Sequence, residues 1–384
     1  MALTDKLTAI GDAIRSKTGG TDLLTLDGMA QAVSGLEIGK SFPNGTEWTE
    51  SNIAWGESDF AQYANGIWVA GRENKGLYYS TDGKEWIQSN ITSGYFLAAD
   101  NGNGIWVGAG AGLYYSSDGK EWTQSNITSG YYASVRYANG VWVAGTQHKS
   151  TSSLATGLYY STDGKEWTQS NITSGNFCVI GNANGVWVAG CDAGAVVSSN
   201  NGLYYSTDGK EWTQSNITSG TYYESSLSYG NGIWVVQKES DGLYYSTDGK
   251  EWTESNITTS SSPFTTAYGP GFWLAVHEAH GTVYKSIDGK EWIESGKTPP
   301  SYGFTGLKYA NGIWIICNYG NNSGEPKGFV YSTDGINWTS CGLSGKGFRS
   351  VHYADGIWVG CSNSSTSYSS SCGLYYSVAW EPTT

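Results

Sequence analysis

The feature that most constrains the fold of this chain is a repeated stretch of nineteen residues. GLYYSTDGKEWTQSNITSG occupies residues 157–175 and returns unchanged at 202–220, while residues 112–130 carry it with only Ser117 in place of threonine. Copying of one supersecondary unit along a chain is typical of repeat architectures. The 384 residues are therefore expected to form an array of similar units rather than two or three unrelated domains.

Two tryptophan motifs alternate along the chain, and together they hold sixteen of its eighteen tryptophans. The first is S-x-D-G-x-x-W, which with a worn copy, FPNGTEW, ends at Trp48, Trp86, Trp122, Trp167, Trp212, Trp252, Trp292 and Trp338. The second is N-G-[IV]-W-V and its variants, centred on Trp68, Trp106, Trp142, Trp187, Trp234, Trp273, Trp314 and Trp358. Their fixed place in every unit predicts that these side chains form the packed core between units.

Each unit has the pattern of a four-stranded antiparallel meander. In one unit ASVRY is followed by Asn-Gly at 139–140 and VWVAG, then by a loop, GLYYS, Asp-Gly and KEWTQS. Asn-Gly and Asp-Gly are the residues that two-residue type I′ hairpins require, because both central positions need a positive φ. Alternation along a strand places Trp142 on one face and Val141 and Val143 on the other.

Four strands in about 36 to 46 residues match the size of a β-propeller blade. The first motif, NGTEWTESN at 44–52, has no earlier strands, whereas the last unit, through GLYYS at 373–377, lacks a fourth strand. If the N-terminal strand completes the C-terminal blade, the ring has no open edge. The predicted fold is all-β, an eight-bladed propeller closed by an N-terminal strand, with seven blades as the alternative.

At S-x-D-G-x-x-W the sequence resembles the Asp-box (BNR-like) repeat of sialidases, sortilin-type receptors and bacterial propellers, with one residue fewer between Asp and Gly. The resemblance covers about 340 residues. It implies that Ser161, Asp163 and Trp167, and their equivalents in other copies, hold a structural hairpin. In those families this hairpin lies on the face opposite the ligand.

Residues 1–40 form a separate predicted segment, followed by the propeller at 41–384. LTDKLTAIGDAIRSKTGGTDLLTLDGMAQAVSGL resembles the short helical N-terminal segment of tail and baseplate-associated proteins of phages and prophages of Gram-positive hosts. Thr4 is placed to cap a first helix, and apolar residues at helical spacing predict a second short one. Two such helices cannot bury their apolar faces alone. We expect residues 1–36 to attach to other tail or particle proteins or to a second copy.

The connections between second and third strands differ in length and charge from unit to unit, whereas both hairpin turns are nearly constant. Variable loops on a constant support are typical of a binding face. Aromatic residues before the first strands lie near the same face, and the first of each pair, as in Tyr95, Tyr131 and Tyr222, is expected to be exposed. The candidate ligand-binding residues are Tyr95, Tyr131, Tyr222, His148, Asp192, Glu239, His277, His280, Tyr319 and Asn321.

No catalytic set, metal site or cofactor motif is predicted. The propeller has only three arginines, at unrelated places within their blades, so a sialidase is not expected. The loop acids lack a partner for paired-carboxylate hydrolysis. HEAH at 277–280 is interpreted as a surface loop rather than a metal site. The NIT triplets, which match glycosylation sequons, are interpreted as products of the copied unit and begin at Asn90, Asn126, Asn171, Asn216 and Asn256.

Composition narrows the partners further. A net charge of −13 disfavours nucleic acid, and no apolar run is long enough to enter a membrane as a helix. The start of the chain lacks a signal-peptide h-region, so secretion by the general route is not expected. The six cysteines are predicted to be free thiols, although Cys361 and Cys372 could cross-link the serine-rich loop between them under oxidising conditions.

These observations favour a non-catalytic recognition protein, a phage tail-associated propeller that binds a host cell-surface glycan or protein. Its expected location is the virion, after synthesis in the bacterial cytoplasm, with the bacterial cell surface as the alternative. A glycan hydrolase or lyase on the same face and a purely structural tail spacer remain alternative functions.

Overall fold

Residues 43–378 form one compact unit in the computed structural model. The structure describes residues 45–54, 57–72, 74–147, 156–192, 201–222, 226–239, 241–258, 263–299, 303–318, 328–343, 346–362 and 373–378. The predicted helical segment at 1–40 lies outside these residues.

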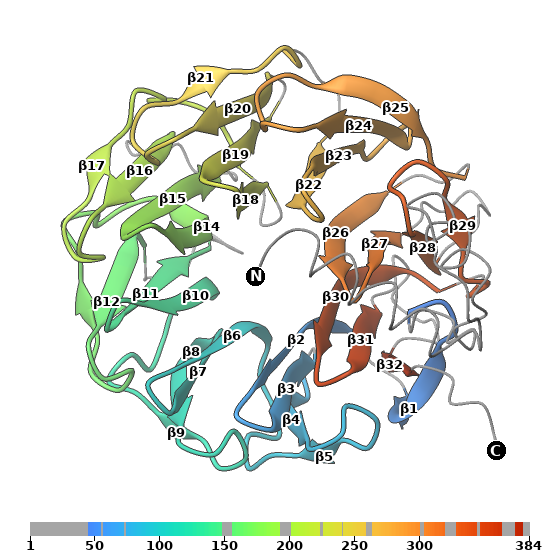
Figure 1. Cartoon of the computed structure of the whole chain (residues 1–384). Helices are drawn as coiled ribbons and strands as arrows, with labels where there is room; N and C mark the ends of the chain where they lie inside the picture. The colour runs from blue at the N-terminus through green and yellow to red at the C-terminus, as the bar shows by residue number, and fades with distance from the viewer. Residues whose placement is uncertain are drawn as a thin grey trace, which may run out of the picture. The chain divides into compact units, whose positions relative to one another are not determined.

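Thirty-two strands form eight four-stranded antiparallel sheets, which are arranged as the blades of a ring (Figure 1). The first strand of each blade is innermost, and together these are β2 (Ser58–Ala64), β6 (Phe96–Gly102), β10 (Tyr132–Ala138), β14 (Asn176–Ala183), β18 (Leu227–Gly230), β22 (Phe264–Tyr268), β26 (Phe304–Ala310) and β30 (Phe348–Ala354). The prediction of eight blades is confirmed.

Each blade continues outward through three more strands. The second strands are β3 (Ile67–Arg72), β7 (Ile105–Gly110), β11 (Val141–Thr146), β15 (Val186–Asp192), β19 (Ile233–Lys238), β23 (Trp273–His277), β27 (Ile313–Asn318) and β31 (Ile357–Ser362). The third strands are β4 (Gly76–Ser80), β8 (Gly112–Ser116), β12 (Leu158–Ser161), β16 (Leu203–Ser206), β20 (Gly242–Ser246), β24 (Thr282–Ser286), β28 (Gly328–Ser332) and β32 (Gly373–Val378). The outermost strands are β5 (Ile87–Gln88), β9 (Thr123–Gln124), β13 (Thr168–Gln169), β17 (Thr213–Gln214), β21 (Thr253–Glu254), β25 (Ile293–Lys297), β29 (Thr339–Ser340) and β1 (Thr49–Ala54).

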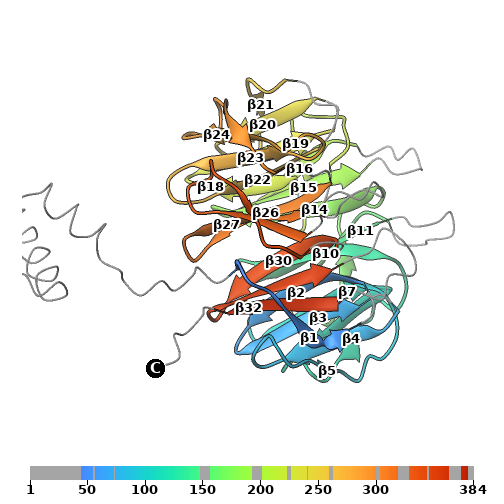
Figure 2. The same ribbon diagram turned by 90° about the vertical axis from the view of Figure 1, so that its right-hand side faces the viewer.

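Blades 1 to 7 begin with β2, β6, β10, β14, β18, β22 and β26 in chain order, and blade 8 joins the two ends of the described chain. Its strand order is β30, β31, β32 and β1, so the N-terminal strand supplies the outermost position (Figure 2). Thr49 pairs with Tyr376 and Glu50 with Tyr375. The predicted closure by the N-terminal strand is therefore confirmed.

The two hairpin turns of a blade differ in conformation. Both residues of the Asn-Gly turns have positive φ, as at Asn139 (51°) and Gly140 (81°), which fits type I′. In the Asp-Gly turns only the glycine does, as at Gly164 (75°), so the type I′ prediction for these turns is wrong. The reason is that the Asp163 carboxylate accepts hydrogen bonds from the N–H groups of the two residues after Gly164. These bonds stabilise a turn in which only the glycine has a positive φ.

Side chains of the repeated serine and aspartate close the Asp-Gly turn, as the sequence predicted. The Gly164 N–H donates to Ser161 Oγ at 2.9 Å, and the Lys165 and Glu166 N–H groups donate to Asp163 Oδ1 at 2.8 and 2.9 Å. Partial burial works to raise the pKa of Asp163, but these N–H donors outweigh it and the net shift is downward. The turn is thus held by an ionised carboxylate.

Blade 8 assembles its turn from two distant parts of the chain. The Gly45 N–H donates to Oγ of Ser377 at 2.6 Å, and Trp48 Nε1 donates to the Gly45 carbonyl oxygen at 2.9 Å. Ser377 lies in β32 and Gly45 precedes β1, so this is the blade-8 version of the turn that Ser161 and Gly164 form within one hairpin. Ring closure therefore uses the same side-chain chemistry as an ordinary blade.

The core lies between the blades, with one buried apolar cluster at each of the eight interfaces. Fourteen of the sixteen motif tryptophans are buried, while Trp48 and Trp338 are partly buried against the same clusters. The prediction that they form the core between units is confirmed. All five described cysteines are free thiols, among them Cys361, whereas Cys372 lies outside the described residues.

The NIT asparagines join neighbouring blades at the outer rim. Nδ2 of Asn171 donates to the Trp212 carbonyl oxygen at 2.9 Å, and the Trp212 N–H donates to Oδ1 of Asn171 at 2.8 Å. We call this pair of bonds the rim clamp. Equivalent clamps start from Asn52, Asn90, Asn126, Asn216 and Asn256, so six of the eight interfaces have one.

The same six interfaces place the lysine of one turn over a tyrosine of the preceding blade. Lys165 Nζ lies 5.5 Å from the centroid of the Tyr115 ring, and the other five distances run from 5.5 to 6.0 Å. Among the described residues neither contact occurs between blades 6 and 7 or between blades 7 and 8. Gly296 and Gly342 stand where the clamp asparagine would be, and Ile336 replaces the lysine of blade 7.

Candidate binding surface

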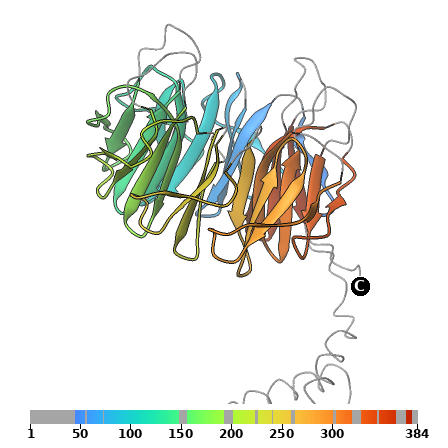
Figure 3. The same ribbon diagram turned by 90° about the horizontal axis from the view of Figure 1, so that it is seen from above.

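The antiparallel order of the strands places the two kinds of hairpin turn at the same end of every blade. We call this end the turn face, and the opposite end, which bears the other connections, the loop face. Figure 3 shows the blades edge-on. The predicted separation of constant turns from variable connections follows from this topology.

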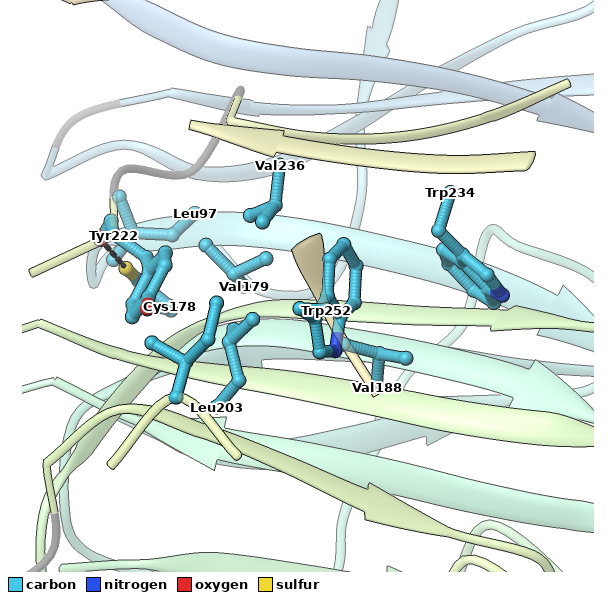
Figure 4. Packing of buried hydrophobic residues seen from close by; sticks show 11 residues of the cluster. Leu97, Cys178, Val179, Val188, Leu203, Tyr222, Trp234, Val236 and Trp252 are labelled. Atoms are coloured by element: carbon cyan, nitrogen blue, oxygen red, sulfur yellow. Dashed lines mark hydrogen bonds between the residues drawn. The ribbon is translucent and has the colours of Figure 1, made fainter. Parts of the chain in front are cut away.

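In seven of the eight blades one aromatic side chain is buried at or just before the start of the innermost strand. These residues, each at most 2% exposed, are Phe96, Tyr132, Phe177, Tyr222, Phe264, Phe304 and Phe348. Tyr222 belongs to this set and is fully buried, so the prediction that it is exposed is wrong (Figure 4). Burial raises the pKa of its hydroxyl far above the ordinary value. It occupies the position of Tyr132, not that of Tyr131.

Tyr95 and Tyr131 are half-buried on neighbouring blades at the loop face, with ring centroids 6.0 Å apart and planes tilted by 32°. Both pack against the cluster that contains Leu97, Ala133 and Tyr222. The three predicted tyrosines are therefore brought into one cluster, in which Tyr222 forms the buried end and the other two reach the surface.

Six of the eight innermost strands contain a β-bulge near their start, which sequence analysis did not identify, and in five of them it follows the buried aromatic residue. The register shifts between Phe96 and Ala98, for example, and leaves Leu97 as the extra residue. Its equivalents Ala133 and Cys178 lie in the same cluster, and Cys178 Sγ lies 3.2 Å from the Tyr222 carbonyl oxygen (Figure 4). The sequence signal is positional, since each follows the glycine that ends the NITSG segment by three residues.

The bulges of blades 8 and 1 are charged instead of apolar. Arg349 Nη1 forms an ion pair with Asp59 Oδ1 at 2.9 Å, and the Ser350 hydroxyl donates to the Asp59 carbonyl oxygen at 2.8 Å. The loop-face end of the innermost strands is thus apolar and aromatic at blades 2 to 4 and ionic at blades 8 and 1.

His277 and His280 form a second group on the loop face, in blade 6. Their rings stack in parallel, with centroids 5.0 Å apart and planes 4° apart. His280 is exposed, but His277 ends β23 and is buried against Phe264, so the prediction of a surface loop holds for only one of the pair. The strand extends to His277 because Phe264 pairs with it across the sheet.

Burial dominates the electrostatics of this group. Burial raises the pKa of Glu278 to about 7, and it lowers the pKa of His277, with His280 adding to the shift. A carboxyl group with a pKa of about 7 is only about half ionised at neutral pH, and the shift at His277 favours its uncharged form. No cluster of three or more His, Cys, Asp or Glu residues able to hold a metal occurs in the described part of the chain.

Glu239 is exposed at the end of blade 5, and its N–H donates to the Thr221 carbonyl oxygen at 3.0 Å. Beside it Lys238 and Asp241 form an ion pair, and Lys238 lies over the Tyr244 ring. Asp192 pairs through its backbone with Asn176 at the end of β15. The predicted His148, Tyr319 and Asn321 lie outside the described residues, as does the side chain of Asp192.

The structure therefore joins five of the predicted residues into two groups. Tyr95, Tyr131 and Tyr222 share one cluster, and His277 and His280 form a stacked pair. Glu239 directly follows β19 in blade 5, where its N–H donates to the residue before Tyr222. Within the described residues, no helix is long and apolar enough to cross a membrane.

No family model and no curated protein matches this chain. Solved structures do match its fold. The computationally designed protein Ika8 has a TM-score of 0.61 at 10% identity, covering 86% of this chain and 98% of its own. YCF48 bound to D1 peptide gives 0.52 at 12% identity (88% and 96% covered), and YCF48 from Cyanidioschyzon merolae gives 0.50 at 9% (87% and 98%). At these identities the likeness concerns the fold alone.

Proposed function

We propose that this chain is a non-catalytic recognition protein, a phage tail-associated propeller whose loop face binds a host cell-surface glycan or protein. The observation that carries the proposal is the contrast between the faces. The turn face repeats the same serine, aspartate and glycine contacts, whereas the loop face presents different chemistry on each blade. Rigid scaffolds with variable connections on one side are suited to recognition.

Two features support a binding role for this face. The half-buried rings of Tyr95 and Tyr131 lie side by side, and tyrosine offers large contact area at low entropic cost. In addition, the similar fold of YCF48 is known in a complex with a D1 peptide. A peptide or protein ligand is thus compatible with this architecture, and the N-terminal resemblance to tail-associated proteins supports display on a particle.

The test compares two double variants of the full chain by glycan array and by binding to host cells. Tyr95→Ala/Tyr131→Ala removes the paired rings from the loop face. Tyr160→Ala/Tyr205→Ala removes two partly buried tyrosines from the third strands near the turn face and serves as the matched control. We expect the loop-face variant to lose at least tenfold in apparent affinity while the control retains binding.

Three outcomes would overturn the proposal. Absence of binding by the wild-type chain favours a structural spacer. Equal loss in both variants indicates damage to the fold rather than to a binding face. Release of new reducing ends from host polysaccharide by the wild-type chain indicates a glycan-degrading enzyme.

A further inference from the structure

We propose that Arg136 and Lys308 form an oxyanion-binding site at the centre of the ring, which would take a carboxylate or phosphate group. The site lies toward the turn face, three residues before the Asn-Gly turn in each strand, and therefore does not depend on the proposed function of the loop face.

The register of the innermost strands places one residue per blade at the same height along the ring axis. In every blade this residue pairs with the apolar residue after the motif tryptophan, as Arg136 does with Val143 and Lys308 with Ile315. The eight members of this level are Gln62, Asp100, Arg136, Gly181, Ser228, Ala267, Lys308 and His352.

Arg136 and Lys308 come from opposite sides of the ring. Their strands, β10 and β26, belong to blades 3 and 7 and face each other across the centre in Figure 1. Burial lowers the pKa of Lys308, and the Arg136 charge lowers it further. The two charges belong to blades on opposite sides of the ring, so they can repel each other only across its centre. Both side chains therefore extend toward the centre.

Solvent reaches both cations even though the surrounding strands enclose them. Arg136 and Lys308 are both exposed although they lie on innermost strands, so each side chain contacts solvent. In the described part of the chain, neither forms an ion pair with a carboxylate. The Asp100 carboxylate of the neighbouring blade 2 interacts electrostatically with Arg136, so one anion faces the two cations at this level.

One arc of this level, between the two cations, is lined by small residues. Blades 4, 5 and 6 lie between blades 3 and 7, and they contribute the small residues Gly181, Ser228 and Ala267. The other arc carries long or charged side chains. A guanidinium and an ammonium that flank an arc of small residues supply the positive charge and the N–H donors that an oxyanion binds.

The remaining titratable groups at this level leave a net positive charge. Both carboxylate oxygens of Asp100 accept backbone N–H bonds, Oδ1 from Asn101 and Oδ2 from Tyr137, each at 2.9 Å. Burial lowers the pKa of His352 to about 4, with Lys308 and Arg136 contributing, so this imidazole is neutral at pH 7. Two cations therefore face one anion that is already bonded.

The experiment titrates the full chain at pH 7 with sodium phosphate, and separately with sodium glucuronate, against sodium chloride at equal ionic strength. Binding is followed by isothermal calorimetry and by the melting temperature. Arg136→Gln/Lys308→Gln removes both cations. Lys75→Gln/Lys297→Gln removes the same charge from exposed lysines outside the ring centre and is the matched control.

We expect one equivalent of anion to bind the wild-type chain and the control, and at least tenfold weaker binding to the Arg136/Lys308 variant. Arg136→Lys/Lys308→Arg keeps both charges and should retain binding. This variant keeps the proposal testable if the glutamine variant folds poorly. Preference for phosphate or for glucuronate identifies the ligand class. Failure of the wild type to bind either anion, or equal binding by all variants, overturns the proposal without bearing on the loop face.

Discussion

Six interfaces of the ring share one construction, and the two that flank blade 7 do not. From blade 8 through blade 6, each interface has a rim clamp and a lysine over a tyrosine, in addition to its buried cluster. Between blades 6 and 7 and between 7 and 8 the described residues show only apolar packing and isolated contacts. There Trp48 stacks on Phe329 with ring centroids 4.0 Å apart, and Lys346 pairs with Glu50.

The difference explains why the nineteen residues are copied as a block. The block contains the tyrosine and the asparagine that face the next blade, and also the lysine and the tryptophan backbone that face the previous one. Each copy therefore carries both halves of an interface and can dock on any other copy. Blade 7 lacks both the lysine and the asparagine of this block, since Ile336 and Gly342 stand in their places. Loss of both contacts is expected when both residues belong to the same copied segment.

The largest effect is expected at ring closure. Deletion of residues 1–54 removes β1, Trp48 and the buried Ile53, and it leaves β32 as an open edge. Loss of this burial and pairing should cost on the order of 5 kcal/mol in the free energy of unfolding. Urea denaturation measures it, with deletion of residues 1–42 as the control, because these lie outside the compact unit. Equal stability of the two truncations would contradict closure by β1.

Breaking one rim clamp should have an intermediate effect. Asn171→Ala removes two hydrogen bonds and leaves the Trp212 N–H without its acceptor, for an expected loss of about 2 kcal/mol. Asn337→Ala is the control, because the side chain of this exposed asparagine bonds within its own turn, to Asp334 at 2.7 Å, and not to a described residue of another blade. Similar losses by chemical denaturation in both variants would show that the clamp adds nothing to the interface.

Acid should weaken blade 8, which holds His352 in β30 against Trp68 of blade 1. Its folded pKa of about 4 lies below the ordinary value of 6.5, so its contribution is present above pH 6.5 and is lost as pH falls toward 4. Because solvent reaches the ring centre, we expect a loss on the order of 1 kcal/mol. Between pH 7 and pH 4, the melting temperature of His352→Gln should fall less steeply than that of the wild-type chain. Parallel curves would rule out this group as the source.

The smallest effect is expected for the lysine over tyrosine contacts. Lys165→Met should lower the free energy of unfolding by about 0.5 kcal/mol, the usual size of an exposed cation–π contact. Lys75→Met controls for removal of one charge, and the pair should be compared by urea denaturation at low salt. A loss no larger than in the control would leave the rim clamp as the only polar contact that distinguishes the six interfaces.

Much of this architecture could be predicted from the sequence because the motifs report local geometry. Asn139 and Gly140 specify their turn, and the worn copy ending at Trp48 predicted ring closure. The Asp163 turn was assigned the wrong type because its carboxylate competes with the hairpin backbone. Tyr222 was misplaced because the adjacent Tyr223 suggested the wrong register, whereas counting from Gly220 places it opposite Tyr132 in the alignment of repeats.

Contacts between blades were harder to predict, because they join residues whose proximity depends on the angle between neighbouring sheets. Asn171 matched a glycosylation sequon, and nothing in its local sequence indicated a partner at Trp212. The sequence likewise did not predict that Arg136 and Lys308 face each other across the ring, because one short motif does not indicate which blades are opposite.

The turn built from Gly45 and Ser377 has a consequence for the order of assembly. The segment that begins β1 leaves the ribosome before any of the strands that it will contact, and it must wait for more than three hundred residues of synthesis. Seven blades can pair as they emerge, but the eighth depends on the most distant contact in the chain, and such contacts form slowly. The nascent protein is thus an open arc for most of its synthesis, and its final step is the meeting of an early strand with a late one.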